Sequence, residues 1–207
     1  MEMIKTFFKR FDFSLSPITI APLLIVLLTY PCMKFLPIQY TYENSLIENF
    51  QLFVLFLTFI FSIKAKTDKK FFISVALICL ILFLREINCG RTIFFPIEGV
   101  ENAFYSWKEI KYGYLAHPLY GLFIGSSALY FLFTKSFMVL FKYIKYAKLS
   151  FYNWLFLFCG IIFGTVGEEI GNFALEEMME TLFYVSFMAL IYLQGHNKKY
   201  IETTEKY

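Results

Sequence analysis

The chain has 207 residues, of which 58% are hydrophobic and 22% aromatic, whereas only 17% are charged. A soluble domain is about 45–50% apolar and about 25% charged, so this composition argues against a soluble enzyme, a disordered tail and a nucleic-acid-binding module. With a net charge of +3 and a mean hydropathy of +0.60, the chain is predicted to form one multi-pass membrane domain over residues 1–207.

The residues before the first apolar stretch allow two interpretations. Ile4, Phe7, Phe8 and Phe11 fall on one face of a short helix, with basic residues around them. Such a helix would lie on the anionic inner leaflet of a membrane; alternatively, these residues form a charged end without regular structure. The apolar stretch that follows is longer than the roughly 7–15 residues of a signal-peptide core, so we expect it to be retained as a helix.

Six apolar stretches approach the roughly 20 residues that a helix needs to cross a hydrocarbon core of about 30 Å. They cover residues 17–37, 46–63, 71–90, 115–134, 151–170 and 177–194. Each is continuous, as expected for helices that satisfy their own backbone polar groups in lipid. We therefore predict an all-α membrane protein built as a bundle of six transmembrane helices.

Charged residues alternate between the two sides of this predicted bundle. One side receives 14 of the 19 basic residues: Lys5, Lys9, Arg10, Lys64, Lys66, Lys69, Lys70, Lys135, Lys142, Lys145, Lys148, Lys198, Lys199 and Lys206. The other side receives 11 of the 16 acidic residues. Because Lys and Arg concentrate in cytoplasmic loops, we expect both termini in the cytoplasm and the protein in a cell membrane, with the bacterial inner membrane fitting best.

Two connecting segments carry their own patterns. Between the third and fourth helices, Val100, Phe104, Trp107 and Ile110 recur at three- or four-residue spacing, which predicts an outer interfacial helix that acts as a lid or as a passive belt. Within residues 135–148, lysines interleave with aromatic residues. Beside a membrane this pattern indicates snorkelling lysines and an aromatic belt rather than nucleic-acid binding.

Glycines keep one side of two predicted helices small. They are Gly121 and Gly125 on the fourth helix, and Gly160, Gly164, Gly167 and Gly171 on the fifth. Small residues at this spacing let helices approach closely. We expect the fourth and fifth helices to pack against each other and to bring their outer ends together.

Polar residues, which are costly at membrane depth, gather at the predicted outer ends of the helices. The candidates are Glu48 and Gln51 on the second helix, Arg85, Glu86, Asn88 and Arg91 at the end of the third, His117 at the start of the fourth and Glu169 at the end of the fifth. We predict that they converge in one pocket beneath the outer headgroups, where convergent polar groups mark a site.

The residue types suggest two kinds of role. Glu48, Glu86, Glu169 and His117 are the catalytic candidates, because carboxylates and imidazoles act as general acids and bases. Arg85, Arg91, Gln51 and Asn88 are the candidate substrate-binding groups, the arginines for phosphate.

Several candidates also have a purely structural interpretation. Arg85 and Glu86 would form a charge pair that joins helix three to a neighbour, and Glu169 would end its helix in water. His117, directly before Pro118, would be an interfacial residue at a helix start.

The sequence contains no HExxH, CxxC, GxSxG or phosphate-binding glycine loop. His117 and His196 belong to opposite ends of the bundle, so they do not form one metal or haem site, and no metal ligands are assigned. A divalent cation held by the carboxylates is the one cofactor that these residue types suit.

Three functions remain open. The protein handles a lipid or lipid-linked headgroup at the outer face, as an enzyme or without catalysis; or it is an accessory, assembly or scaffold subunit with a protein partner in the membrane. The third function, proton or cation transport, is disfavoured by the nearly apolar inner halves of the helices. Membrane lipids are the expected partners, and nucleic acid is not.

Overall fold

The computed structural model describes residues 10–100 and 102–205. The helix predicted around Ile4, Phe7 and Phe8 lies outside these described residues, whereas Phe11 lies in a short strand. A helix is present in each of the six predicted ranges: α2 (Pro17–Phe35), α3 (Leu46–Ile63), α4 (Lys69–Glu86), α6 (Ala116–Phe133), α8 (Phe151–Glu169) and α9 (Phe173–His196).

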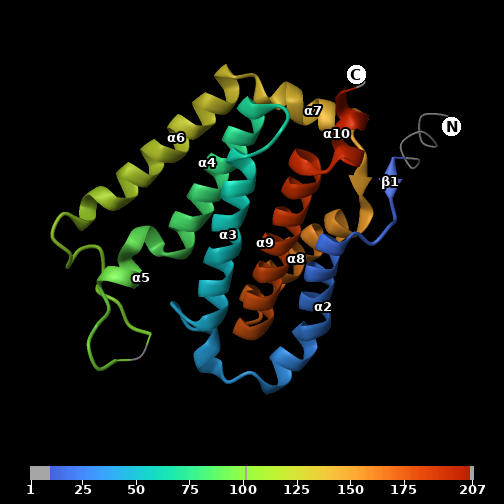
Figure 1. The fold of residues 1–207 in the computed structure, drawn as a ribbon. Coiled ribbons are helices and arrows are strands. Elements are labelled where there is room, and N and C mark those ends of the chain that lie inside the picture. The colour runs from blue at the N-terminus through green and yellow to red at the C-terminus, as the bar shows by residue number, and fades with distance from the viewer. Residues whose placement is uncertain (1–9, 101, 206–207) are drawn as a thin grey trace.

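Shorter elements connect and flank these helices. They are β1 (Phe11–Asp12), the 3₁₀ helices Ile38–Thr41, Asn88–Gly90 and Gly113–Leu115, α5 (Arg91–Phe94), α7 (Ser136–Tyr146), β2 (Leu149–Ser150) and α10 (Lys198–Glu205). Successive long helices run in opposite directions, so that β1, β2, α7 and α10 gather at one end of the bundle (Figure 1).

Within the described residues, four helices are long and apolar enough to cross a membrane: α2, α3 with its preceding turn (Ile38–Ile63), α6 with its preceding turn (Gly113–Phe133), and α8. A fifth is obtained if α4 and residues Asn88–Phe94, which meet at a bend of 56°, form one span. α9 is not among them; it carries Glu176, Glu177 and Glu180 close to one end. The apolar helices of the prediction are thus confirmed, but not its number of six spans.

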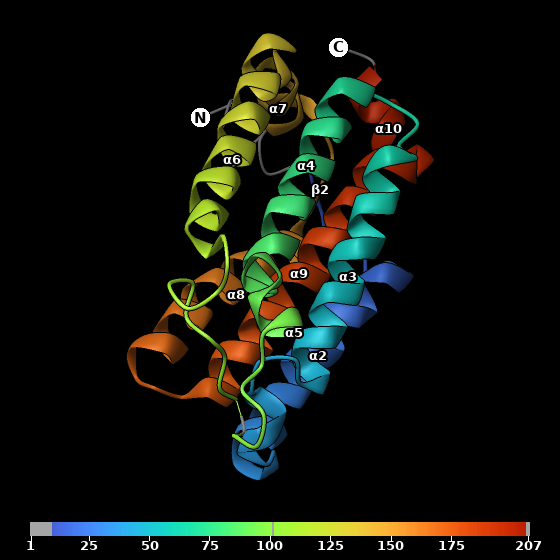
Figure 2. The same ribbon diagram turned by 90° about the vertical axis from the view of Figure 1, so that its left-hand side faces the viewer.

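α9 is the central helix of the bundle. It packs on α8, α3 and α2, and Figures 1 and 2 show these helices around it, with α4 beside α3. Tyr184 and Val185 of α9 are buried against Val54 and Leu55 of α3 in one core cluster. A second cluster joins α4 to α7 through Phe72 and the ring of Tyr143, among other residues.

The glycines of α8 pack against α9, not against α6 as predicted. A Cβ added at Gly160 would lie 2.7 Å from the backbone nitrogen of Phe183, and one at Gly167 would lie 2.6 Å from that of Glu176. Only glycine permits this close approach of the two backbones. Gly121 of α6 instead has nothing within 4 Å of an added Cβ, so the spacing correctly indicated close packing but assigned the wrong partner.

The third predicted helix ends earlier than expected. α4 stops at Glu86, and three residues with positive φ follow it, Asn88 (45°), Cys89 (53°) and Gly90 (90°). The left-handed conformation at these residues breaks the helix and turns the chain into α5. The predicted range of residues 71–90 therefore contains a break before its end.

The described residues between α5 and Gly113 do not form the predicted interfacial helix. Pro96 and Phe104 instead form an antiparallel bridge, with hydrogen bonds from Ile97 N to the carbonyl of Ala103 and from Tyr105 N to that of Phe95. Turns follow as far as Gly113. Of the spaced apolar residues that predicted a helix, Val100 and Phe104 lie in this short hairpin, and Trp107 and Ile110 lie in the turns that follow it. The hairpin satisfies its backbone polar groups by hydrogen bonds across the turn.

The two ends of the bundle differ in charge. The end with β1, α7, α10 and the α3–α4 connection, here named the basic end, carries Arg10 and the lysines of residues 64–70, 135–148 and 198–199. The opposite end, named the acidic end, carries the glutamates at the start of α3, the end of α4, the end of α8 and the start of α9.

Candidate functional site

A polar cavity of about 190 Å³ lies at the acidic end, between α3, α4 and α9. Its lining consists of six carboxylates and one guanidinium: Glu43, Glu48, Glu86, Glu176, Glu177, Glu180 and Arg85. These side chains come from three segments that are far apart in the sequence. The cavity is therefore a product of the helix packing and not of any local motif.

Glu48 is placed by the start of α3. It lies in the first turn of the helix and is only 5% exposed. Its carboxylate accepts a hydrogen bond from the backbone N–H of Asn44, the residue before the N-cap Ser45. The Asn44 side chain in turn donates to the carbonyl of Thr92, which ties the start of α3 to the segment beyond α4.

Arg85 is held by two carboxylates of the cavity wall. Its Nη2 lies 2.7 Å from Glu180 Oε1 and 3.0 Å from Glu86 Oε1. The same Glu86 oxygen accepts a 2.5 Å hydrogen bond from the hydroxyl of Tyr184. The guanidinium side chain is 53% exposed while that of Glu86 is 8% exposed, so Arg85 covers a buried carboxylate from the solvent side.

Gln51 does not line the cavity but bonds to Glu177 of its wall. It is 0% exposed, and its Nε2 donates to Glu177 Oε2 at 3.0 Å and to Thr181 Oγ1 at 3.0 Å. Below it lies the apolar cluster that includes Val54 and Leu55. The polar space is consequently confined to the acidic end by an apolar floor.

The charge balance of the cavity favours cations. Six carboxylates line it against one guanidinium, and that guanidinium is already paired with two of them. Like charges held this close repel each other, and a bound cation relieves the repulsion. A phosphate group would instead add negative charge and find the guanidinium engaged.

The cavity brings together only part of the predicted set. Glu48, Arg85 and Glu86 line it, and Gln51 contacts it through Glu177. Glu169 is exposed at the end of α8, outside the lining. His117 is also exposed, with its ring edge-to-face with Trp107 at 6.0 Å. Glu169 and His117 lie outside the cavity because they occupy exposed positions, at the end of α8 and at the start of α6.

Arg91 and Asn88 lie just beyond the break in α4. Arg91 sits over the ring of Phe104 at 5.9 Å. The surrounding donors and acceptors favour the Asn88 amide with its oxygen and nitrogen exchanged, and in that orientation the oxygen accepts from Arg91 Nη2 at 2.8 Å and from Nε at 3.2 Å. The positive charge of Arg91 interacts electrostatically with Glu43, which lies at the rim of the cavity. Asn102, in the hairpin, accepts from the backbone N–H of Glu43, so the hairpin also reaches this rim.

The sequence interpretation did not select the residues that α9 contributes. Glu177, Glu180 and Tyr184 recur at spacings of three and four residues, which places them on one helix face. This polar stripe on an otherwise apolar helix is the signal that would have identified them.

A metal site is not apparent in the described part of the chain. There, no three His, Cys, Asp or Glu side chains are grouped as metal ligands would be. The carboxylates of the cavity thus line a common space, and their arrangement does not by itself define a coordination shell.

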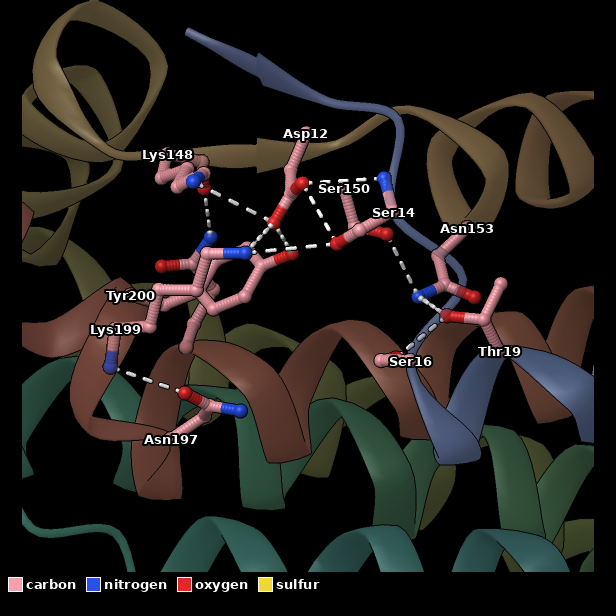
Figure 3. A network of polar contacts seen from close by, with 11 residues as sticks. Asp12, Ser14, Ser16, Thr19, Lys148, Ser150, Asn153, Asn197, Lys199 and Tyr200 are labelled. Atoms are coloured by element: carbon pink, nitrogen blue, oxygen red, sulfur yellow. Dashed lines mark hydrogen bonds and ion pairs between the residues drawn. The ribbon is translucent and has the colours of Figure 1, made fainter.

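A second polar network lies at the opposite, basic end (Figure 3). Asp12 of β1 is 7% exposed and accepts from Lys199 at 2.6 Å, from the Tyr200 hydroxyl at 3.1 Å and from the Ser14 hydroxyl at 2.7 Å. Burial by itself raises the pKa of this carboxyl, but the hydrogen bonds from Lys199, Ser14 and Tyr200 outweigh it and hold the pKa well below its usual range.

Asn153 extends the network to α2. It donates to Thr19 at 3.1 Å and to Ser150 at 3.0 Å. With β1 paired in parallel to β2, these contacts join the N-terminal strand, α2, α8 and α10. Because the buried Asp12 carboxylate is already paired with Lys199 and hydrogen-bonded to Ser14 and Tyr200, we interpret this network as structural and the carboxylate cavity as the candidate site.

No family model matches the chain, and comparison with the curated proteins and with the solved structures likewise finds no match.

Proposed function

We propose that the chain is an integral membrane protein with six spans, α9 being the sixth. α9 has 24 residues, and its length of about 36 Å exceeds the hydrocarbon thickness of about 30 Å. Two of its acidic side chains bond to neighbouring helices, Glu177 to Gln51 and Glu180 to Arg85. A helix whose polar groups are partnered inside a bundle does not need the apolar surface of a lipid-facing helix.

The proposed orientation puts the basic end in the cytoplasm and the acidic end outside, as in a bacterial inner membrane. It is supported by the gathering of lysines at one end of the bundle. A reporter fused after Tyr207 should be active only as a cytoplasmic reporter. Activity of a periplasmic reporter at the same position would contradict this orientation.

Within this frame, the carboxylate cavity binds the ammonium group of a lipid or lipid-linked headgroup. The observation that carries the proposal is the convergence of six carboxylates in one cavity whose guanidinium is already paired. A primary ammonium donates three hydrogen bonds and carries the compensating charge. Glu48 is the expected direct contact, because among the described residues its buried carboxylate has no ion-pair partner.

A zwitterionic headgroup suits the surroundings of the cavity better than a free amine. Arg91 lies beyond the α4 break, near Glu43 at the rim, and in the described residues no carboxylate forms an ion pair with it. Its partners Asn88 and Phe104 are uncharged, so its charge remains for the phosphate of a headgroup whose ammonium reaches Glu48. Of the two arginines predicted to bind phosphate, we therefore assign this role to Arg91, because Arg85 is paired with Glu86 and Glu180.

The apolar floor supports binding over transport. Below Gln51, the side chains of Val54 and Leu55 in α3 and Val185 in α9 are 1–2% exposed. Farther along α3, the hydroxyls of Thr58 and Ser62 donate to carbonyls of their own helix. A continuous polar path, which transport of a cation requires, is not supported by these groups.

The proposal is tested by native mass spectrometry of the purified protein with phosphatidylethanolamine and phosphatidylcholine. The two headgroups differ in that the trimethylated ammonium of choline donates no N–H hydrogen bond. We expect ethanolamine lipid to bind more tightly, and Glu48→Gln to weaken it about tenfold or more, because a charge-assisted hydrogen bond contributes about 1.5–3 kcal/mol. Glu169→Gln, an equal change on an exposed residue of the same end, is the matched control.

Two results would refute the proposal. One is equal affinity for the two lipids, and the other is an ethanolamine preference that survives Glu48→Gln. A stoichiometric protein partner that co-purifies on the acidic end, without any lipid preference, would favour the accessory-subunit function instead.

A further inference from the structure

α7 lies across the basic end of the bundle and does not continue α6 (Figure 1). Lys135, between the two helices, has a φ of 56°, and this left-handed residue changes the chain direction. The N-terminus of α7 is fixed by Ser136, which is buried and accepts a hydrogen bond from Ser74 of α4. Tyr143, one turn before the end of α7, stacks on Phe71 of α4 at 5.4 Å.

The opposite end of α7 is held by the N-terminal strand. The Arg10 guanidinium donates to the carbonyls of Ile144 and Ala147, at 2.5 and 3.1 Å, and to that of Lys145. These carbonyls belong to the last turn of α7 and the residue that follows it, where a cation compensates the helix dipole. Both ends of α7 are thus anchored to the bundle, and its direction across the basic end is set.

α7 has a buried side and an exposed one. The side that carries Ser136 and Tyr143 is buried in the protein. A second side is exposed and apolar, with Phe141 at 66%, Met138 at 56% and Ile144 at 48% exposure. At 100° per residue, Lys142 lies next to this exposed side and Lys145 lies on it, between Phe141 and Met138, whereas Lys135 directly precedes the helix.

The lysines in and around α7 have no acidic counterpart in their own segment. Residues 135–148 include four lysines and no Asp or Glu. In the part of the chain that the structure describes, Lys135, Lys142 and Lys145 form no ion pair, whereas Lys148 is engaged with Asp12 at 3.5 Å. An exposed apolar side next to uncompensated lysines matches an anionic membrane surface, where the apolar side enters the acyl region and the lysines meet headgroups.

We infer that α7 is an in-plane helix that binds anionic phospholipid headgroups through Lys135, Lys142 and Lys145. The inference rests on the proposed insertion of the long helices in a membrane, but not on the ligand of the carboxylate cavity. It assigns the basic end a lipid-binding surface separate from the acidic end.

The experiment compares phosphatidylglycerol with phosphatidylcholine binding to the full-length protein by native mass spectrometry. The triple variant K135Q/K142Q/K145Q should lose the phosphatidylglycerol preference, at about fivefold in affinity per lysine. The control K64Q/K69Q/K70Q makes an equal charge change at the end of α3 and the start of α4, on the same end of the bundle, and should keep most of the preference.

A second measurement tests whether the exposed apolar side of α7 enters the membrane, independently of the lysine charges. In vesicles of phosphatidylcholine and phosphatidylglycerol, the tryptophan fluorescence added by Phe141→Trp should be quenched by lipids brominated near the headgroup end of the acyl chain. The same substitution at Tyr143, which is buried against α4, should be quenched less.

The outcomes separate this inference from the proposed function. Equal losses in the two triple variants, no preference for phosphatidylglycerol, or no quenching at position 141 would each overturn the assignment of α7. Glu48→Gln should leave phosphatidylglycerol binding intact. One combination is that the purified protein shows no preference for ethanolamine lipid while the α7 triple variant still loses the preference for phosphatidylglycerol. That combination would refute the proposed ligand of the cavity and support the assignment of α7.

Discussion

Arg85 of α4 and Glu180 of α9 form a 2.7 Å ion pair although 95 residues separate them in the sequence. The same guanidinium reaches Glu86, which also accepts from Tyr184 of α9. Two helices that do not follow each other in the chain are thereby joined along the wall of the carboxylate cavity. The pair sets the shape of the cavity and partly neutralises it.

Replacement of Arg85 is expected to destabilise the protein. In Arg85→Ala, Glu86 and Glu180 lose their cation and repel each other, and Glu86 stays buried. We expect a loss of about 1–3 kcal/mol, reduced from the buried-pair range because the guanidinium is half exposed. Thermal unfolding in detergent should show a decrease in Tm of several degrees.

The double variant Arg85→Ala/Glu180→Gln identifies the cause of that loss. If repulsion between uncompensated carboxylates is responsible, the double variant is less unstable than the sum of the two single variants. Glu168→Gln, on an exposed residue of α8, should leave Tm unchanged. Strict additivity would show that the pair is not coupled.

The close packing of α8 on α9 predicts a contrast between two glycines. Gly167→Ala forces a methyl group to within 2.6 Å of the Glu176 backbone, so α8 must move away from α9 at the cavity. Overpacking of this kind costs about 1–3 kcal/mol and should also weaken ethanolamine-lipid binding. Gly121→Ala, where space is open, should be neutral or slightly stabilising. Equal Tm values for the two variants would argue against the tight α8–α9 contact.

Gln51 is expected to matter through Glu177. Gln51→Leu has a similar volume but removes the donor to Glu177 Oε2 and Thr181. A buried acceptor that loses its donor costs about 1–3 kcal/mol, which thermal unfolding should detect. Gln39→Leu, on a residue of the exposed 3₁₀ turn, is the control and should change Tm little.

The Asp12 network predicts a contribution to stability that is lost in acid. The pKa of Asp12 is lowered in the folded protein, since its hydrogen bonds with Lys199, Ser14 and Tyr200 outweigh the opposing effect of burial. A carboxyl with a depressed folded pKa stabilises fully above its unfolded pKa of about 3.9, and the stabilisation decreases as the pH falls below that value.

The measurement is the difference in Tm between the wild type and Asp12→Asn as a function of pH. The difference should be constant near neutrality and should shrink below about pH 4. Asp68→Asn, on a half-buried residue outside this network, should give no comparable pH-dependent difference. A wild-type advantage that grows on acidification would contradict the assigned direction of the pKa shift.

Hydropathy predicted the helices well because burial in lipid or in a bundle acts on each helix separately. The range 46–63 coincides with α3, and 151–170 ends within one residue of α8. The break after Glu86 was missed, because three consecutive left-handed residues, two of them not glycine, have no hydropathy signature. The hairpin around Pro96 and Phe104 was missed because its apolar spacing also suits a helix.

The candidate site was predicted in part, and the difference between Glu169 and Glu176 explains the limit. Both glutamates belong to the α8–α9 turn region, and the sequence assigns them to the same end of the molecule. Glu176 lines the cavity, whereas Glu169 is exposed on the last turn of α8. Whether a side chain lines the cavity depends on the direction in which it points from its packed helix. This direction turns by about 100° from one helical residue to the next.

Sequence alone determined which segments become helices, which end of the bundle is basic and which acidic, and that buried carboxylates gather at one end. These properties follow from short-range patterns, since apolar runs and charge placement are local in the chain. Tertiary structure decided that α8 packs on α9 and not on α6, that Arg85 pairs with Glu180, and that six carboxylates surround one cavity. Such contacts depend on backbone separation and helix rotation, which arise only when distant segments are packed together.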